Sequence, residues 1–389
     1  MRGPAGETEQ QDQAALAWPA GAGTRCGEEA QLGGGERVAR GCGDRLHWRD
    51  NERGGEEGLP AMKILFIGGT GFISTAVSRL LVERGADLTV LNRGRRNPTL
   101  PGVRHLAADI HDPAATAAAL AGQQFDVVVN WVAYVPDDVT RDLALFGSRV
   151  KHYVFISSAS AYQKPPATYR ITESTPLSNP YWTYARDKIA CETRLLEAYR
   201  AEGFPVTIVR PSLTYDPNLP IAIGGWGCYT LADRLKTGRP IIVHGDGSSL
   251  WVVTHAEDFA RGFIGLLGHD KAPGHAFHIT SDEVLTWNQI YTTIAEALGV
   301  EPQIVHIPSD FIARVMPSLG PGLLGDKAWS VVFDNSKIKE FVPGFRAAIP
   351  FREGIRRTLD WFAADPARQR VDPAVNAEMD AILAAYAAL

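Results

Sequence analysis

The feature that most constrains the fold is a glycine-rich turn between a short apolar run and an amphipathic segment. Residues 62–67 read Met-Lys-Ile-Leu-Phe-Ile, residues 68–71 read Gly-Gly-Thr-Gly, and a helical apolar period covers residues 73–84. Glycines allow a tight strand-to-helix turn and a close approach of the backbone to a pyrophosphate, whose charge then lies at the helix N-terminus. In this setting the spacing predicts a dinucleotide site. Ser74 stands where the pattern usually has its third glycine, so we expect the helix to lie slightly further from the strand.

From residue 62 onward, short apolar runs alternate with longer amphipathic segments. Continuous apolar runs are typical of strands in a parallel sheet that is covered on both faces. Strands that alternate with helices predict a doubly wound sheet, so the fold class is α/β, a Rossmann domain with a smaller C-terminal substrate lobe. We predict strands at residues 64–67, 88–91, 104–107, 127–130, 153–156 and 206–209, and helices at residues 73–84, 113–121 and 184–201.

The chain divides into four parts. Residues 1–61 are rich in Gly, Glu, Arg and Gln without a sustained apolar period, so we expect a disordered extension, or a regulatory arm that folds on a partner. We assign residues 62–215 to the NAD(P)-binding Rossmann domain. Residues 216–365 form mainly a substrate-binding lobe, with some elements that return to the Rossmann sheet, and residues 366–389 form a C-terminal helix.

Composition limits the partners and the cellular compartment that we expect for the chain. The net charge of -5 offers no general attraction to nucleic acid or to anionic membranes. No apolar run approaches the about 20 residues of a membrane-spanning helix. The four cysteines show no metal-ligand spacing, so we expect neither a metal site nor a disulfide framework. A cytoplasmic protein that binds a small molecule is the expectation.

The end of the second predicted strand bears on the choice of cofactor. An NAD enzyme usually has an acid there, which binds the ribose hydroxyls, whereas this chain has Asn92, followed by Arg93, Arg95 and Arg96. Without the carboxylate a 2′-phosphate is not repelled, and an arginine can pair with it. NADP is therefore preferred, with NAD as the alternative, because the arginines could also be solvated loop residues.

Further cofactor contacts are expected along the same edge of the sheet. Asp109 and Ile110 end the third predicted strand and would meet the adenine, although Asp109 could instead cap the helix that follows. The cofactor contacts expected near the glycine turn are Gly68, Gly71, Phe72 and Ile73.

Tyr184 and Lys188 open a predicted helix and lie four residues apart, so both side chains can point into one cleft. A phenol with a pKa near 10 is too weak a base at neutral pH. A neighbouring ammonium and a positive nicotinamide ring both favour the phenolate and should lower that pKa. Tyr184 would then exchange the proton of the substrate hydroxyl, and Lys188 would also bind the nicotinamide ribose.

A second group must hold the reacting oxygen. Ser157, Ser158 and Ser160 follow a predicted strand at the edge where open α/β sheets bind ligands. We expect Ser158 to bond the substrate oxygen, with Ser157 and Ser160 as weaker candidates. Trp251 would line the substrate pocket, as would Trp226 and Tyr229, or these aromatic residues would belong to the core of the lobe.

With these motifs the chain resembles the extended short-chain dehydrogenases/reductases, in the NAD-dependent epimerase/dehydratase group. The resemblance covers residues 62–362 and includes the glycine turn, Ser157-Ser158, Tyr184 with Lys188, and the run from Arg210 to Pro217. It implies a catalytic hydroxyl at Ser158, the acid/base at Tyr184 and its lysine at Lys188. It also implies that the backbone around Pro211 and Leu213 meets the nicotinamide carboxamide.

Departures from the family pattern narrow the reaction. Ala159-Ser160 stands where sugar dehydratases carry an Asp-Glu pair, which argues against dehydration. Trp251 stands where nucleotide-sugar enzymes usually have a diphosphate-binding Arg. His255 follows it and is expected to cap the next helix. The stretch 134–149 is short where relatives place the helix that builds the dimer, so a homodimer stays open. This short stretch, together with the run from Arg234 to Pro240 and the C-terminal half, also resembles the chloroplast stem-loop RNA-binding branch of the same superfamily.

We therefore expect an NAD(P)-dependent oxidoreductase that transfers hydride at a secondary alcohol or ketone of a small, sugar-like substrate. A nucleotide-sugar epimerase with tightly held NAD would use the same residues and is the first alternative. An RNA-binding or scaffold protein with a vestigial cofactor pocket is the alternative from another class, and it predicts a basic stripe with interleaved aromatic residues.

Overall fold

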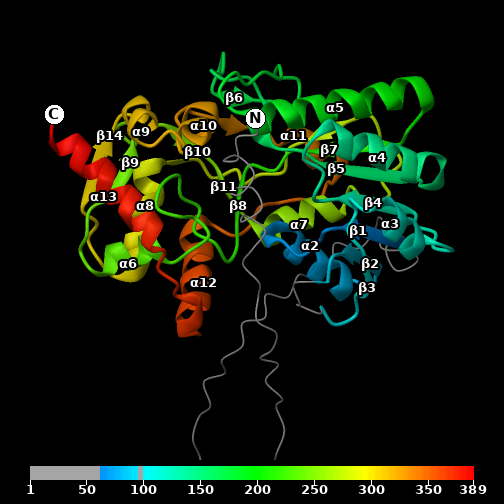
Figure 1. The fold of residues 1–389 in the computed structure, drawn as a ribbon, viewed down its shortest axis with the longest axis horizontal. Coiled ribbons are helices and arrows are strands. Elements are labelled where there is room, and N and C mark those ends of the chain that lie inside the picture. The colour runs from blue at the N-terminus through cyan, green and yellow to red at the C-terminus, as the bar shows by residue number, and fades with distance from the viewer. Residues whose placement is uncertain (1–61, 95–99) are drawn as a thin grey trace, which may run out of the picture.

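The computed structural model describes residues 62–94 and 100–389, and the largest unit in them is a seven-stranded sheet (Figure 1). Its strand order is β12-β7-β5-β4-β1-β2-β3, and every neighbouring pair is parallel. The strands are β1 (Lys63–Ile67), β2 (Asp87–Asn92), β3 (Arg104–Ala107), β4 (Val127–Asn130), β5 (His152–Ile156), β7 (Val206–Val209) and β12 (Ala276–Phe277). All six predicted strands are confirmed.

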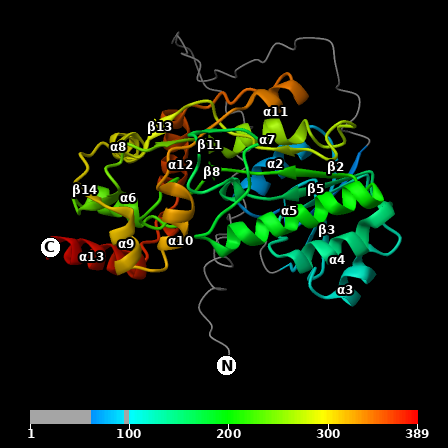
Figure 2. The same cartoon turned by 90° about the horizontal axis from the view of Figure 1, so that it is seen from above.

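Helices cover both faces of this sheet, because successive strand residues point to opposite sides. In β1, Ile64 and Phe66 pack with α2 and α7, whereas Leu65 and Ile67 pack on the side of α4 and α5 (Figure 2). The helices are α2 (Phe72–Glu83), α3 (Pro113–Leu120), α4 (Pro136–Phe146), α5 (Thr183–Glu202) and α7 (Ala256–Ile264). The three predicted helices, which correspond to α2, α3 and α5, are confirmed, as is the α/β Rossmann class.

The remaining elements form a second packing unit, which we call the small lobe (Figure 1). Its core contains Trp251, Trp287 and Tyr291 and extends to Met379 and Ile382 of the last helix. Its helices are α6 (Thr230–Lys236), α8 (Trp287–Leu298), α9 (Ser309–Val315), α10 (Gly320–Gly322), η3 (Leu323–Lys327), α12 (Phe351–Ala363) and α13 (Pro373–Ala387).

Four short strand pairs complete the part of the chain that the structure describes: β11 with β8, β14 with β9, β10 with β13 and β15 with β6. Their bounds are β6 (Arg170–Ile171), β8 (Leu213–Tyr215), β9 (Ile241–His244), β10 (Leu250–Trp251), β11 (Val253–His255), β13 (Leu285–Thr286), β14 (Ile304–Ile307) and β15 (Val332–Phe333). The short helices are η1 (Gly147–Arg149), η2 (Ala159–Ala161), α11 (Ser336–Phe341) and η4 (Pro366–Arg368).

The sheet order positions the candidate site. From β1 the chain proceeds to β2 and β3 on one side, and then to β4, β5 and β7 on the other. A crevice opens at such a switch point, outside the carboxyl ends of the strands, and open α/β sheets bind ligands there. The expected extension at residues 1–61 lies outside the described residues.

Candidate active site

The turn after β1 has a backbone that only glycine adopts readily. Gly68 and Gly69 have φ values of +91° and +84°, and a Cβ on Gly68 would lie 2.8 Å from Val132 Cγ1. The α2 helix begins at Phe72 without an acidic residue in its first turn. Ser74 accepts a hydrogen bond from the Gly71 N–H at 2.9 Å, so its hydroxyl serves the helix end. The turn therefore offers an anion a narrow, glycine-lined approach.

Asn92 and Arg93, the residues expected at the cofactor ribose, lie at the tip of β2. Asn92 is half-buried, and its Oδ1 accepts a hydrogen bond from the Gly94 N–H at 2.8 Å. Arg93 is exposed, while Arg95 and Arg96, which the sequence also implicated, lie outside the described residues. Asn92 and Arg93 thus stand beside each other at the edge where the second ribose is expected.

The residues that follow β3 show which aspartate caps the next helix. The helix that starts at Pro113 is capped by Asp112, which accepts hydrogen bonds from Ala114 N and Ala115 N. The capping role considered for Asp109 is therefore wrong. The Asp109 carboxylate instead accepts a bond from His111 N at 3.1 Å, and Ile110 is buried in the core beside it.

The serines after β5 point in different directions. Ser157 is buried, and its hydroxyl donates to Glu192 Oε1 at 2.5 Å, away from the other two. Ser158 is half-buried, and its Oγ lies 2.9 Å from the Oγ of buried Ser160. Of the three hydroxyls, that of Ser158 is thus the one that remains accessible.

Lys188 is buried beneath Tyr184. Its Nζ donates to Ala133 O at 2.6 Å and to Ile156 O at 2.8 Å, at the ends of β4 and β5. It lies 5.7 Å from the Tyr184 ring centroid and 4.7 Å from that of Tyr134. Burial lowers the pKa of Lys188 to about 8. The helix thus places phenol and ammonium together, as their spacing predicts.

The surroundings of the Tyr184 phenol act against ionisation when no cofactor is bound. We expected Lys188 and a positive nicotinamide ring together to lower the pKa of Tyr184. In the protein alone, burial raises this pKa and Tyr134 adds to the rise, whereas an interaction with the Ser158 hydroxyl opposes it in part. Lys188 donates to two carbonyls, so desolvation has the largest effect on the phenol.

The other candidate residues lie either beside the serine loop or in the core of the small lobe. Pro211 O accepts a hydrogen bond from Ala159 N at 2.9 Å, and Leu213 begins β8, so both lie beside the serine loop. Trp251 is only 1% exposed and packs against Trp287, with ring centroids 5.4 Å apart. The core alternative considered for Trp251 is therefore the one that the structure supports. Tyr229 is buried in the same core.

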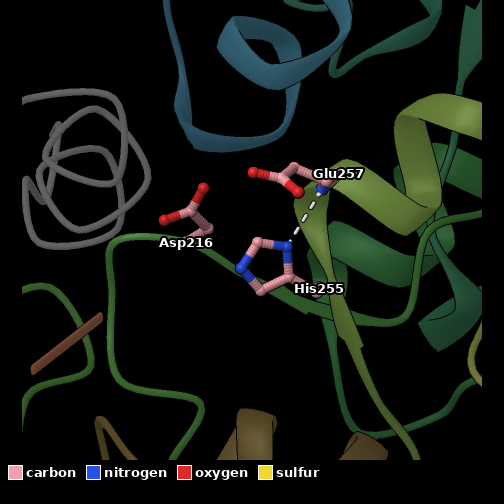
Figure 3. A group of neighbouring side chains, drawn as sticks. All are labelled: Asp216, His255 and Glu257. Carbon is pink, nitrogen blue, oxygen red and sulfur yellow. Dashed lines mark hydrogen bonds between the residues drawn. The ribbon is translucent and has the colours of Figure 1, made fainter. Parts of the chain in front are cut away.

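Asp216, His255 and Glu257 form a compact group at the start of α7 (Figure 3). Their ligand-type atoms all lie within 4.8 Å of one another. His255 Nδ1 accepts a hydrogen bond from the Glu257 N–H at 3.3 Å, which confirms the predicted cap. Asp216 has a φ of 141°, a conformation that favours glycine.

The chemistry of this group does not fit a metal centre. A neutral imidazole that accepts at Nδ1 carries its proton on Nε2, whereas a metal ligand needs a lone pair there and a donating N–H at the other nitrogen. Glu257 Oε2 also lies 3.3 Å from Arg357 Nη1 and 3.8 Å from Arg261 Nη2. The group is a hydrogen-bonded and ion-paired helix start.

The sequence did not predict Tyr134 and Asp326, which influence Tyr184, or Lys164, whose ammonium lies 3.9 Å from the Asp326 carboxylate. Tyr134 follows β4, and Lys164 and Asp326 come from a loop and from η3 of the small lobe. None belongs to a motif, and Asp326 is far from Tyr184 in sequence. Only Lys164 has a local sequence signal, because the turn residues Pro165 and Pro166 follow it, and this signal is weak.

The chain is similar to proteins of a known family. The sequence profile described as "NAD dependent epimerase/dehydratase family" matches residues 64–280. The chain is 30% identical over 267 residues to the chloroplast stem-loop binding protein of 41 kDa b of Arabidopsis thaliana, covering 64% of this chain and 67% of that protein. It is 26% identical over 288 residues to 2'-dehydrokanamycin reductase of Streptomyces kanamyceticus, covering 73% and 80%.

Solved structures share the fold. A UDP-glucose 4-epimerase of Thermus thermophilus in complex with NAD superposes with a TM-score of 0.62 at 22% identity, covering 78% of this chain and 99% of that one. An epimerase from Methanothermobacter thermautotrophicus gives 0.65 at 17% identity, covering 79% and 93%. Among the helices described in this chain, none combines the length and apolar character needed to cross a membrane.

Proposed function

The chain belongs to the NAD dependent epimerase/dehydratase family, and on that premise we propose that it is an NAD(P)-dependent reductase or dehydrogenase of a secondary alcohol or ketone. The observation that carries the proposal is the meeting of Ser158, Tyr184 and Lys188 at the carboxyl end of β5, two strands from the glycine turn that follows β1.

The residues present fit a bound dinucleotide. The glycine turn leaves no room for side chains at its narrowest point, and the start of α2 has no competing acid. We assign Gly68, Gly71, Phe72 and Ile73 to the pyrophosphate, and the exposed Arg93 beside Asn92 supports NADP over NAD. When bound, the cofactor supplies the donor or acceptor of the hydride.

The proposed proton transfer runs between the phenol and the substrate oxygen. The neutral Tyr184 phenol would donate a proton to the oxygen of a ketone as hydride reaches its carbon, and it would accept that proton in the reverse, oxidative direction. The Ser158 hydroxyl would bond the same oxygen, and Lys188 would hold the nicotinamide ribose. An epimerase, which oxidises and then reduces its substrate, would use the same groups and is the alternative.

The test begins with cofactor binding. NADPH and NADH are titrated into the full chain by tryptophan fluorescence, and a panel of ketones and sugar-derived carbonyl compounds is screened for NADPH oxidation. Tyr184→Phe should bind NADPH as the wild type does and lose about 10²–10⁴-fold in turnover. Tyr181→Phe, which changes an exposed neighbour, is the control. Unchanged turnover in Tyr184→Phe would refute the proposal, while epimerisation without net NADPH consumption would favour the alternative.

A second candidate rests on the 30% identity to a protein named for stem-loop binding. Under it the chain would bind folded RNA and use its cofactor crevice only as a scaffold. Salt-sensitive binding of a stem-loop RNA together with no turnover of any carbonyl compound would favour this function. The net charge of -5 speaks against it.

A further inference from the structure

The segment that contains α10 and η3 covers the loop that leads into α5. The two segments lie side by side in both views (Figure 1, Figure 2). A Cβ on Gly325 would lie 3.0 Å from Trp182 Cβ, which shows how closely they pack. The Asn179 amide donates to Gly325 O at 2.7 Å and to Ser160 O at 2.9 Å, so it joins the small lobe to the serine loop.

The end of η3 is held from the other side as well. Lys327 O accepts hydrogen bonds from Trp287 Nε1 at 3.1 Å and from His244 Nε2 at 2.9 Å. Both donors belong to the buried part of the small lobe. The backbone that carries Asp326 and Lys327 is therefore held on both sides, next to the start of α5.

Three charges meet at this contact. Asp326 Oδ2 accepts from Lys327 Nζ at 3.4 Å, and Asp326 Oδ1 lies 3.9 Å from Lys164 Nζ. The Lys164 side chain is only 2% exposed. Within the described part of the chain, no acceptor is recorded within hydrogen-bonding distance of its ammonium, which carries three donors. Burial lowers the pKa of Lys164, since a charged group with so few acceptors is costly to bury.

The Trp182 ring connects the cluster with the ring of Tyr184. Lys327 Nζ is 5.8 Å from the centroid of the Trp182 ring, and that ring is 5.0 Å from the ring of Tyr184. After burial and Tyr134, the Asp326 charge is a further cause of the raised pKa of Tyr184. A substrate that is held at Tyr184 and extends along the Trp182 ring would thus reach the cluster.

We propose that Lys164, Asp326 and Lys327 form a substrate subsite that recognises an anionic oxygen group, a carboxylate or a phosphate, next to the reacting carbon. Two ammonium groups face one carboxylate, so the subsite has a positive balance, and Lys164 has donors to offer. Asp326 would accept bonds from substrate hydroxyls. This subsite rests on the proposed function, because it places the reacting carbon at Tyr184.

The test uses compounds that share a pyranose ring and differ at one position: D-glucose, D-glucuronate and D-glucose 6-phosphate. Each is titrated calorimetrically into the full chain saturated with NADP⁺. At least one anion should bind about tenfold or more tighter than glucose, as expected for hydrogen bonds to a charged group. Preference for glucuronate identifies a carboxylate site, and preference for the phosphate ester identifies a phosphate site.

Substitutions of Lys164 test whether the preference for an anion depends on the cluster. Lys164→Met should abolish it, Lys164→Arg should retain most of it, and Lys271→Met, which alters an exposed lysine elsewhere, should leave it unchanged. Equal binding of all three compounds, binding of neither anion, or a preference that survives in Lys164→Met would overturn the subsite. NADP⁺ affinity is measured first on the same proteins, so a failure of cofactor binding, which tests the proposed function, is read separately.

Discussion

Glu192 and Arg210 form a two-bond ion pair behind the carboxyl edge of the sheet. Arg210 Nε and Nη2 donate to the two oxygens of Glu192 at 2.9 and 2.6 Å, and both side chains are almost completely buried. Glu192 belongs to α5, two turns beyond Tyr184, and also accepts from Ser157, which precedes Ser158. The pair thus fastens α5, the helix of the proposed acid/base, to the end of β7, and the Ser157 bond fastens the same helix to the end of β5, next to Ser158.

Breaking this pair should strongly destabilise the protein. Arg210→Met leaves the Glu192 carboxylate buried without its partner, which should lower the free energy of unfolding by about 3–5 kcal/mol. Urea denaturation measures the loss. Arg352→Gln, which removes an exposed partner of Glu296, should cost less than about 1 kcal/mol. Similar losses in the two variants would show that the buried pair contributes no more to the free energy of unfolding than the exposed pair.

The cofactor choice can be reversed at the end of β2. Asn92→Asp places a carboxylate where the 2′-phosphate of NADP is expected, and the like charges repel. We expect the Kd for NADPH to rise about tenfold, while that for NADH stays level or falls. Fluorescence titration checks both values. Gln124→Glu adds the same charge away from this edge and should change neither, and an unchanged NADPH affinity in Asn92→Asp would contradict the NADP assignment.

Replacing Asp216 with glycine should increase the stability of the fold. Its φ of 141° costs a residue with a Cβ about 1–3 kcal/mol, and burial, followed by the charge of Glu257, raises its pKa to about 6. Because this pKa lies above the unfolded value of 3.8, ionisation destabilises the fold above about pH 6 and not below about pH 4. Asp216→Gly should therefore raise Tm at pH 7.5, and the gain should shrink as the pH falls. Asp216→Asn should show only the pH-dependent part, and a lower Tm in Asp216→Gly would mean that the side chain stabilises the fold.

Three buried histidines should weaken the fold in mild acid. Burial lowers the pKa of His152, His244 and His255 to about 4, from an ordinary value of 6.5. Between these values the unfolded chain binds protons that the folded chain does not, so stability is full above about pH 6.5 and falls toward pH 4. Denaturation at pH 7.5, 6 and 5 measures the slope. His152→Gln should reduce it by up to about 1.4 kcal/mol per pH unit, whereas the exposed His105→Gln should not.

Much of the fold could be predicted because its signals are local. The apolar runs of β1, β4 and β5 and the glycine turn after β1 each reveal an element within a few residues. Tyr184 and Lys188 share a helix face because their spacing is four residues. Aromatic residues in the small lobe were harder to assign, since an indole such as that of Trp251 suits a pocket as well as a core.

The amino-acid order by itself determined the Rossmann sheet, the glycine turn after β1 and the pairing of phenol with ammonium, because hydrophobic periodicity, turn conformation and helical spacing act between neighbours in the chain. Only the tertiary structure decided that burial raises the pKa of Tyr184, that Ser157 donates to Glu192, and that Lys164 lies beside Asp326. Desolvation and charge are sums over groups from distant segments, and those sums exist only once the segments have packed together.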